Sequence, residues 1–343
     1  MRNTSMKSHG LILGKFVPLP KGHQFLIETA LSEVDSLTLV IYNATEETQV
    51  PLNIRSRWIR TLYPSIRVIE AWDGPTVIGD TPEIHKLHED YVIRQLGIKD
   101  ITHFFSSEFY GEHMSKALGA VNRTVDMKRS TVQISGTVVR KDYYGNRGFL
   151  SPIMYKDLIT KIVFLGAPSS GKTTLCECLA KHFQTCWMPE YGREYWEQNH
   201  VDRRLSLAQL TEIAKGHIVR EDCLVQESNQ YLFVDTNATT TAQFSYYYHG
   251  SCEPELERLA HESYLRYDLH ILCDIDIPYA DTWDRSGKVH RALFQEQIVC
   301  DLIKRKIPFV KVSGTLEDRI RKVEFLLKTF HKFRPLSVMQ DFK

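Results

Sequence analysis

Two segments of this chain repeat one order of elements: a short apolar strand, a glycine-containing loop and an amphipathic helix. The first covers residues 10–33 and the second covers residues 161–183. In the first helix Leu26, Ala30 and Val34 recur at the spacing of an inner helical face. Such units build parallel sheets covered by helices, and each restart indicates a new sheet. The sequence therefore predicts an α/β protein with two parallel-sheet domains.

Short apolar runs supply the remaining strands of two such sheets. We expect them at residues 37–42, 66–71 and 103–106 in the first half, and at 231–234, 269–273 and 308–312 in the second. Turn-forming residues gather between residues 147 and 160, so we assign the domains to residues 1–150 and 151–343. A length of 343 residues also favours two domains.

Charge, hydropathy and cysteine content exclude several functions. Lys and Arg total 43 and Asp and Glu total 42, so no overall positive charge recruits nucleic acid or an anionic membrane. The apolar runs are much shorter than the about 20 residues of a transmembrane helix. The polar start of the chain does not resemble a secretory signal. Seven cysteines without a C-x-x-C pair indicate free thiols in a reducing compartment, so we expect a cytoplasmic protein.

The loop at residues 166–173 reads G-A-P-S-S-G-K-T and matches G-x-x-x-x-G-K-[ST] at every fixed position. Its glycines allow backbone amides to surround phosphate oxygens at a helix N-terminus. Lys172 would place a positive charge on the β and γ phosphates of ATP, and Thr173 would bind Mg²⁺. The residues expected to bind ATP here are Gly166, Ser169, Ser170, Gly171, Lys172, Thr173 and Thr174.

A P-loop kinase also needs a second metal anchor, a base and cations over the transferred phosphoryl group. Asp235 ends an apolar strand and is the candidate anchor, although such an aspartate can also cap the next helix. Glu190 falls where the second strand would end and could accept the proton of a substrate hydroxyl. Arg285 and Arg291 follow the strand at 269–273, where a lid would lie. The alternatives are a solvated turn for Glu190 and ordinary surface charges for the two arginines.

Residues 14–23 read G-K-F-V-P-L-P-K-G-H and again join a strand to a helix. His23 at the helix start can donate a hydrogen bond to phosphate, assisted by the helix dipole. Far downstream, residues 134–140 read I-S-G-T-V-V-R, where hydroxyl groups can cap a helix and Arg140 can reach phosphates. The second segment alone fits a plain helix cap, but the pair of segments indicates a nucleotide site.

These two segments resemble the G-x-F-x-P-x-H-x-G-H loop and the I-S-x-T-x-x-R motif of cytidylyltransferase-like nucleotidyltransferases. A P-loop kinase directly behind such a domain resembles the NadR family of bifunctional nicotinamide mononucleotide (NMN) adenylyltransferases and ribosylnicotinamide kinases. Residues 106–108 resemble that family's S-S-E, residues 190–195 its E-Y-[AG]-R-[DE]-[YF], and residues 235–243 its D-T-D-x-x-T-T-x-A/Q. The resemblance covers residues 10–327.

The resemblance implies a Rossmann-like adenylyltransferase domain followed by a P-loop kinase domain. The kinase would transfer the γ-phosphoryl group of ATP to the 5′-hydroxyl of nicotinamide riboside and give NMN. The adenylyltransferase would join NMN to the α-phosphorus of a second ATP, releasing pyrophosphate and forming NAD. We expect Mg²⁺ as cofactor, these nucleotides as ligands, and no nucleic-acid or membrane partner; a homo-oligomer stays open.

The motifs assign each activity its site residues. For adenylyl transfer, Lys15, His23 and Arg140 are the expected catalytic groups, and ATP would also contact Gly14, Phe16, Gly22, Ser135 and Thr137. For the kinase, the expected catalytic groups are Lys172, Glu190 and Asp235, and the expected metal ligands are Thr173 and Asp235. ATP would also contact Arg285 and Arg291. The substrate would contact Glu190, Tyr191, Arg193 and Asp235.

Three positions depart from the family pattern. Pro20 replaces the first His of H-x-G-H, Asn237 replaces the second acid of D-T-D, and the lid pattern is only loosely kept around residues 279–285. Pro20 bears on adenylyl transfer, so one alternative is an N-terminal domain that only senses NMN or NAD for the kinase. Another is a kinase acting on nucleic-acid ends, for which the expected basic, aromatic-lined channel has no counterpart in the sequence.

The start of the chain and a group of histidines add no further activity to this interpretation. Some NadR proteins carry an N-terminal helix-turn-helix that represses transcription; here a strand begins by about residue 10, so we expect no such module. His85, His88 and Glu89 recur at helical spacing, as metal ligands can. Metal sites usually need three or four ligands and no further ligand is nearby, so we interpret residues 83–95 as a charged helix face.

Overall fold

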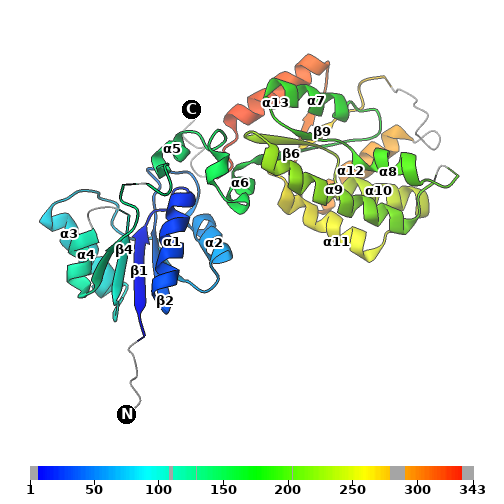
Figure 1. The fold of residues 1–343 in the computed structure, drawn as a ribbon. Helices are drawn as coiled ribbons and strands as arrows, with labels where there is room; N and C mark the ends of the chain where they lie inside the picture. The colour runs from blue at the N-terminus through cyan, green and yellow to red at the C-terminus, as the bar shows by residue number, and fades with distance from the viewer. Residues whose placement is uncertain (1–6, 108–110, 129, 203, 279–289, 334–343) are drawn as a thin grey trace, which may run out of the picture. The chain divides into compact units, whose positions relative to one another are not determined.

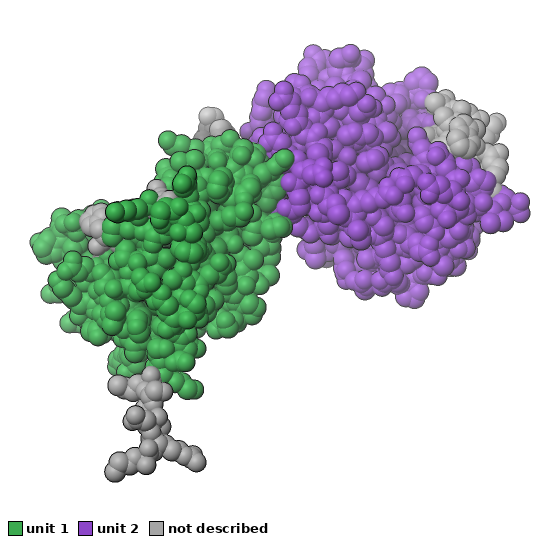
Figure 2. Space-filling model, viewed as in Figure 1, with its two compact units in different colours: residues 1–155, 333–343 green, residues 156–332 purple. Residues whose placement is uncertain are grey.

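The computed structural model describes residues 7–107, 111–128, 130–202, 204–278 and 290–333. They form two compact units, the first holding the chain up to Tyr155 and the second holding residues 156–332 (Figure 2). Each unit is a five-stranded parallel sheet with helices, so the predicted α/β class is confirmed (Figure 1). Among the described residues, no helix is both long and apolar enough to cross a bilayer.

The sheet of the first unit has the strand order β3-β2-β1-β4-β5. Its strands are β1 (His9–Gly14), β2 (Ser36–Tyr42), β3 (Arg67–Ala71), β4 (His103–Ser106) and β5 (Val121–Thr124). Its helices and turns are α1 (Lys21–Glu33), α2 (Leu52–Leu62), α3 (Pro82–Asp90), η1 (Tyr91–Gln95), α4 (Gly111–Leu118), α5 (Gly136–Lys141) and η2 (Arg147–Phe149); α6 (Pro152–Leu158) begins in this unit and ends in the next. The chain order reverses beside β1, and ligands of open α/β sheets bind at the carboxyl ends of strands at such a point.

Alternate residues of these strands fill the two faces of the first sheet. Leu11 and Val40 pack with Tyr91 of η1 and Met114 of α4, on the face that α3 and α4 cover (Figure 1). The intervening residues point to the face that α1 and α2 cover, where Trp58 is fully buried. Burial on both faces is the reason that these strands read as continuous apolar runs.

The sheet of the second unit has the order β10-β9-β6-β8-β7. Its strands are β6 (Thr160–Leu165), β7 (Trp187–Met188), β8 (Tyr231–Asp235), β9 (Leu269–Cys273) and β10 (Val310–Val312). Its helices and turns are α7 (Lys172–His182), α8 (Tyr191–Asn199), α9 (Leu207–Glu227), α10 (Ala238–His249), α11 (Pro254–Glu262), η3 (Ser263–Arg266), α12 (Arg291–Lys304) and α13 (Leu316–Thr329). The central strand β6 leads directly into the phosphate-loop motif.

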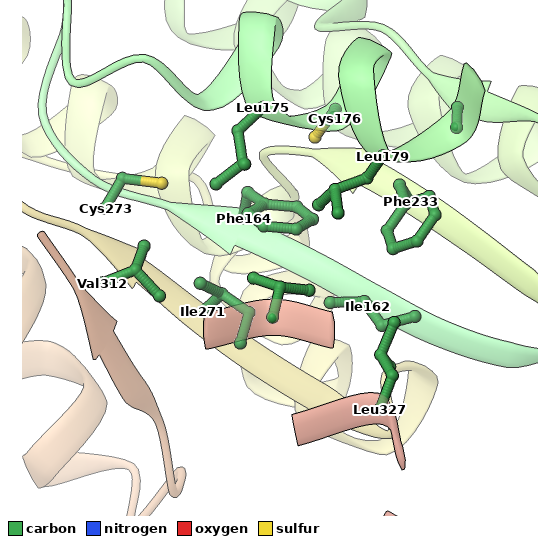
Figure 3. Packing of buried hydrophobic residues seen from close by; sticks show 12 residues of the cluster. Ile162, Phe164, Leu175, Cys176, Leu179, Phe233, Ile271, Cys273, Val312 and Leu327 are labelled. Carbon is green, nitrogen blue, oxygen red and sulfur yellow. The ribbon is translucent and has the colours of Figure 1, made fainter. Parts of the chain in front are cut away.

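An apolar cluster holds α7 against the second sheet. Leu175 and Leu179 of α7 lie close to Phe164 of β6 and Phe233 of β8 (Figure 3). Full burial of one such side chain stabilises a fold by about 1.5–3 kcal/mol. The cluster therefore fixes the start of α7 at the carboxyl end of β6.

The same cluster includes Cys176. All seven cysteines of the chain are free thiols, as predicted.

A buried charged network joins α9 to the rest of the second unit. Glu221 is fully buried and accepts hydrogen bonds from Lys161 Nζ at 3.0 Å, Arg266 Nη2 at 2.9 Å and Tyr267 OH at 2.7 Å. Burial alone would raise the pKa of Glu221, but Lys161 and Arg266 outweigh burial and hold that pKa below its ordinary value. Removing one partner from such a network is strongly destabilising, so these contacts anchor α9 to β6 and to residues 266–267.

Candidate functional sites

The phosphate loop of the second unit needs glycine at its first position. Gly166 has φ 144°, and a Cβ there would lie 2.7 Å from the carbonyl oxygen of Cys273. Within the loop, Lys172 is nearly buried, and its Nζ donates hydrogen bonds to the carbonyl oxygens of Gly166 at 3.0 Å and Ala167 at 3.2 Å. The ammonium group is thus held against the carbonyl oxygens of the first two loop residues, within the loop that the motif predicts for phosphate.

Thr173 and Asp235 meet directly beside this loop. Thr173 Oγ1 donates a hydrogen bond of 2.5 Å to Asp235 Oδ2. Asp235 is fully buried, and its Oδ1 has no hydrogen-bond partner among the described residues. Burial, aided by the negative charge of Glu190, raises the pKa of Asp235 to about 6. A hydroxyl and a carboxylate with a spare oxygen form the oxygen donor set that suits Mg²⁺.

The helix that follows Asp235 begins at a different residue. Asn237 is the N-cap of α10, and its Oδ1 accepts hydrogen bonds from the amides of Thr239 at 3.0 Å and Thr240 at 3.4 Å. The interpretation of Asp235 as a helix cap is therefore wrong.

A cavity of about 520 Å³ opens beside the phosphate loop. Glu190, which follows β7 and is the N-cap of α8, lines it together with Arg193, whose Nη2 lies 3.9 Å from Glu190 Oε2. Tyr191, predicted to contact substrate, does not line it. The Tyr191 ring instead packs against α9, where a Cβ at Gly216 would come within 2.4 Å of it.

The arginines expected over the phosphates are placed differently. Arg291 is the first residue of α12, and its guanidinium donates to the carbonyl oxygens of Ile277 at 2.7 Å and Ser169 at 2.9 Å. It supports the loop backbone and does not line the cavity. Arg285 and the loosely kept lid pattern lie outside the described residues.

Several side chains of this cavity were not predicted as site residues. Trp196 of α8, Phe244 and Tyr248 of α10, and His217 of α9 line it. Phe244 and Tyr248 recur at helical spacing, a pattern that also fits an ordinary buried helix face. Their position on α10, directly after the D-T-x segment, is the signal that could have indicated them.

A second cavity, of about 440 Å³, lies at the carboxyl ends of the strands in the first unit. All eight residues expected to bind ATP or catalyse there line it: Gly14, Lys15, Phe16, Gly22, His23, Ser135, Thr137 and Arg140. Arg140 Nη1 donates to the carbonyl oxygen of Val17 at 3.0 Å, which joins the two motifs across the cavity. Ser135 caps α5, since its side chain accepts from the amide of Val138 at 3.2 Å, as the motif predicts.

Pro20 is the N-cap of α1 and lines the same cavity. Its carbonyl oxygen accepts hydrogen bonds from the amides of His23 at 2.8 Å and Gln24 at 3.1 Å, and no side chain caps the helix. The helix N-terminus therefore points its dipole at the cavity without the side-chain donor that a histidine at residue 20 would supply.

The acidic residue Glu47 was missed by sequence analysis. It lies after β2, and its carboxylate forms ion pairs with Lys15 at 2.5 Å and Arg140 at 3.1 Å. The hydrogen bond from Lys15 is the main cause of a pKa below the ordinary value for Glu47. Two cations expected to bind phosphate are thus paired with one carboxylate.

Histidines also line this cavity, on its α3 side. The rings of His85 and His113 stack with centroids 4.0 Å apart, and each bonds a carboxylate: His85 to Asp80 at 2.8 Å, and His113 to Glu89 at 2.9 Å. His88 bonds the carbonyl oxygen of Val77 at 3.0 Å. Within the part of the chain that the structure describes, no group of three or more His, Cys, Asp or Glu side chains is arranged to hold a metal ion.

Comparisons with known proteins find one family model and curated relatives. An AAA domain family model matches residues 161–319. The chain is 29% identical over 328 residues to the trifunctional NAD biosynthesis/regulator protein NadR of Salmonella typhimurium, covering 90% of this chain and 79% of the relative. The protein of the same name from Escherichia coli is 29% identical over 327 residues with the same coverage.

Two solved structures share the fold. A crystal structure of NadR protein in complex with NAD and AMP-PNP has a TM-score of 0.56 and 21% identity, covering 94% of this chain and 96% of that chain. One of NadR protein in complex with NR has a TM-score of 0.54, 21% identity and the same coverage.

Proposed function

We propose that this chain is a NadR-type protein of NAD metabolism that makes NAD from nicotinamide riboside in two ATP-dependent steps. The second unit phosphorylates the riboside to NMN, and the first unit transfers the adenylyl group of another ATP to NMN. Support comes from the two cavities, each lined by its own nucleotide motif, and from the ligands named with the related structures.

The hydrogen bond between Thr173 and Asp235 carries the kinase assignment. It brings a hydroxyl and a buried carboxylate together beside Lys172, where Mg²⁺ and the β and γ phosphates of ATP would be held. Mg²⁺ supplies charge neutralisation on those phosphates. Glu190 accepts the proton of the riboside 5′-hydroxyl. The hydroxyl oxygen bonds to the γ-phosphorus as the bond to the β-phosphate breaks and ADP leaves. The faces of Trp196 and the α10 aromatics suit the cationic nicotinamide ring.

In the first unit, alignment and charge carry the reaction. His23 at the start of α1, with Lys15 and Arg140, stabilises the charge that develops on the triphosphate. A phosphate oxygen of NMN bonds to the α-phosphorus, and pyrophosphate leaves with the electron pair. No covalent enzyme intermediate is needed, because positioning and electrostatic stabilisation suffice.

A second candidate is a first unit that binds NMN or NAD without catalysis. It is favoured by Pro20, which has no side-chain donor, and by Glu47, which pairs with Lys15 and Arg140. Mass spectrometry of products from nicotinamide riboside, ATP and Mg²⁺ separates the candidates. Formation of both NMN and NAD would support the two-step function, and formation of NMN alone would support the sensor. If neither product forms, the kinase assignment is overturned.

A further inference from the structure

One face of α9 packs against the start of α8. Ile213 and Gly216 meet the first turn of α8, because a Cβ at Gly192 would lie 3.6 Å from Ile213 Cγ2 and the Tyr191 ring lies against Gly216. The guanidinium of Arg220 lies over the Tyr191 ring, 4.0 Å from its centroid. These residues recur at the spacing of one helix face. The N-cap of α8, which is Glu190, is therefore held beside this face of α9.

His217 belongs to the same face and lines the kinase cavity. It is only 4% exposed, and its Nε2 is buried without a hydrogen-bond partner among the described residues. A buried polar atom of this kind usually has a partner. The neighbouring charged groups are Glu221, Arg220, Arg266 and Glu190.

The charge of His217 follows from these surroundings. Burial lowers the pKa of His217, Glu221 and Glu190 partly oppose that effect, and Arg266 and Arg220 add to it. The imidazole is consequently neutral near pH 7, with one nitrogen protonated and able to donate. Since Glu221 is bound on several sides, α9 cannot carry this imidazole far from its position.

We propose that His217 is a positioning residue for Glu190, donating a hydrogen bond from Nε2 to the Glu190 carboxylate when the phosphoryl acceptor is bound. One carboxylate oxygen then accepts from His217 and the other faces the acceptor hydroxyl. The inference rests on the proposed kinase function, because it assigns the orientation of that reaction's base. It explains why a polar nitrogen is kept buried at a cavity wall that apolar side chains could fill.

The first test compares His217→Leu with His217→Gln. Glutamine can place an amide donor near the position of Nε2, whereas leucine fills similar space without a donor. His270 on β9 offers a matched control: it is also buried, its Nε2 has no hydrogen-bond partner within the described part of the chain, and it does not line the cavity. Riboside phosphorylation is measured with ATP and Mg²⁺ for all three variants, including His270→Leu.

We expect His217→Leu to lower kcat by about tenfold or more, a part of what a general base contributes. The KM for ATP should stay within about twofold, and His217→Gln should recover most of kcat. His270→Leu should leave kcat within about twofold of wild type, whatever it does to stability. Equal kcat values for His217→Leu and His270→Leu, or no recovery by glutamine, would overturn the proposal.

A second measurement needs no turnover and separates this inference from the proposed function. ¹⁵N NMR of labelled histidine reports which nitrogen of His217 is protonated, in full-length protein with Mg²⁺, a non-hydrolysable ATP analogue and nicotinamide riboside. We expect a protonated Nε2 whose resonance moves in Glu190→Gln. An Nε2 signal that is identical in both proteins contradicts the contact. A wild-type enzyme that does not phosphorylate riboside contradicts only the proposed function.

Discussion

Glu47 accepts a hydrogen bond from Lys15 at 2.5 Å, although 32 residues separate them in the chain. The same carboxylate lies 3.1 Å from Arg140. Two positive charges that would attract a triphosphate are therefore offset by one negative charge inside the cavity. A triphosphate that binds there has to compete with Glu47 for both cations.

Replacing Glu47 by glutamine should strengthen ATP binding in the first unit. Loss of the carboxylate leaves Lys15 and Arg140 free for phosphate, and we expect a gain of about three- to tenfold in affinity for these partly exposed pairs. Calorimetric titration of ATP measures it, in a Lys172→Ala background that weakens the other ATP site. Glu46→Gln is the control, because Glu46 is exposed on the same turn. Unchanged or weaker binding would mean that Glu47 does not compete with ATP.

Replacing Lys172 by alanine should reduce riboside phosphorylation about 10²–10³-fold, as other deletions of a preorganised cation do. The fold should persist, because among the described residues Nζ bonds only carbonyl oxygens of its own loop. Lys181→Ala, at the exposed end of α7, should leave the rate unchanged. Product formation is followed by mass spectrometry beside a circular dichroism check. A folded Lys172→Ala protein that phosphorylates riboside at the wild-type rate would contradict the kinase assignment.

Asp235→Asn should stabilise the second unit at neutral pH. The folded-state pKa of about 6 exceeds the ordinary 3.8, so the protonated carboxyl favours folding below about pH 4. That contribution is lost as pH rises through 6, and an uncharged asparagine avoids the loss. We expect a gain on the order of 2–3 kcal/mol above pH 7 without Mg²⁺, and almost none at pH 4.

Hydrogen exchange of β8 amides at several pH values measures this difference. Glu296→Gln, which changes an exposed carboxylate of the same unit, should show no pH-dependent gain. If Asp235 holds Mg²⁺ as proposed, the same Asp235→Asn protein should need more Mg²⁺ for phosphorylation. A stability gain that is equal at pH 4 and pH 8 would contradict the pKa argument.

Pro20→His should speed NAD formation from NMN and ATP by about tenfold or more, since it adds a donor where the helix dipole already favours phosphate. The backbone at Pro20, with φ −71° and ψ 168°, suits any residue. Pro20→Ala, which adds no donor, should not reproduce the gain. If wild type is already fast and Pro20→His changes nothing, a lysine of the loop supplies the missing contact.

Most strands were predictable because they are buried on both faces and read as apolar runs. Strand β4 begins and ends at the predicted residues, and β9 does as well. Of the two remaining edge strands, β5 was not predicted, and β7 was expected only as the strand that ends near Glu190. Strand β5 is exposed for most of its length, and β7 has only two residues, so neither has an apolar period to detect.

The candidate sites divide in a similar way. Residues within the two nucleotide motifs line the expected cavities, because a motif fixes its own backbone path. Glu47 and His217 lie outside any motif, and only the tertiary fold brings them to those cavities. Tyr191 shows the converse: it is inside a motif, yet its ring is drawn to Gly216, where the absence of a side chain leaves space.

Asn237 caps α10 without carrying the negative charge that an aspartate at this position would have. Either residue can start α10, because both accept amide hydrogens at an N-cap. Only asparagine does so without adding a third negative charge to a region that already holds Asp235 and Glu190. An aspartate at residue 237 would start the same helix but add a negative charge beside the phosphate loop, so asparagine leaves a weaker repulsion for any phosphate that enters the cavity.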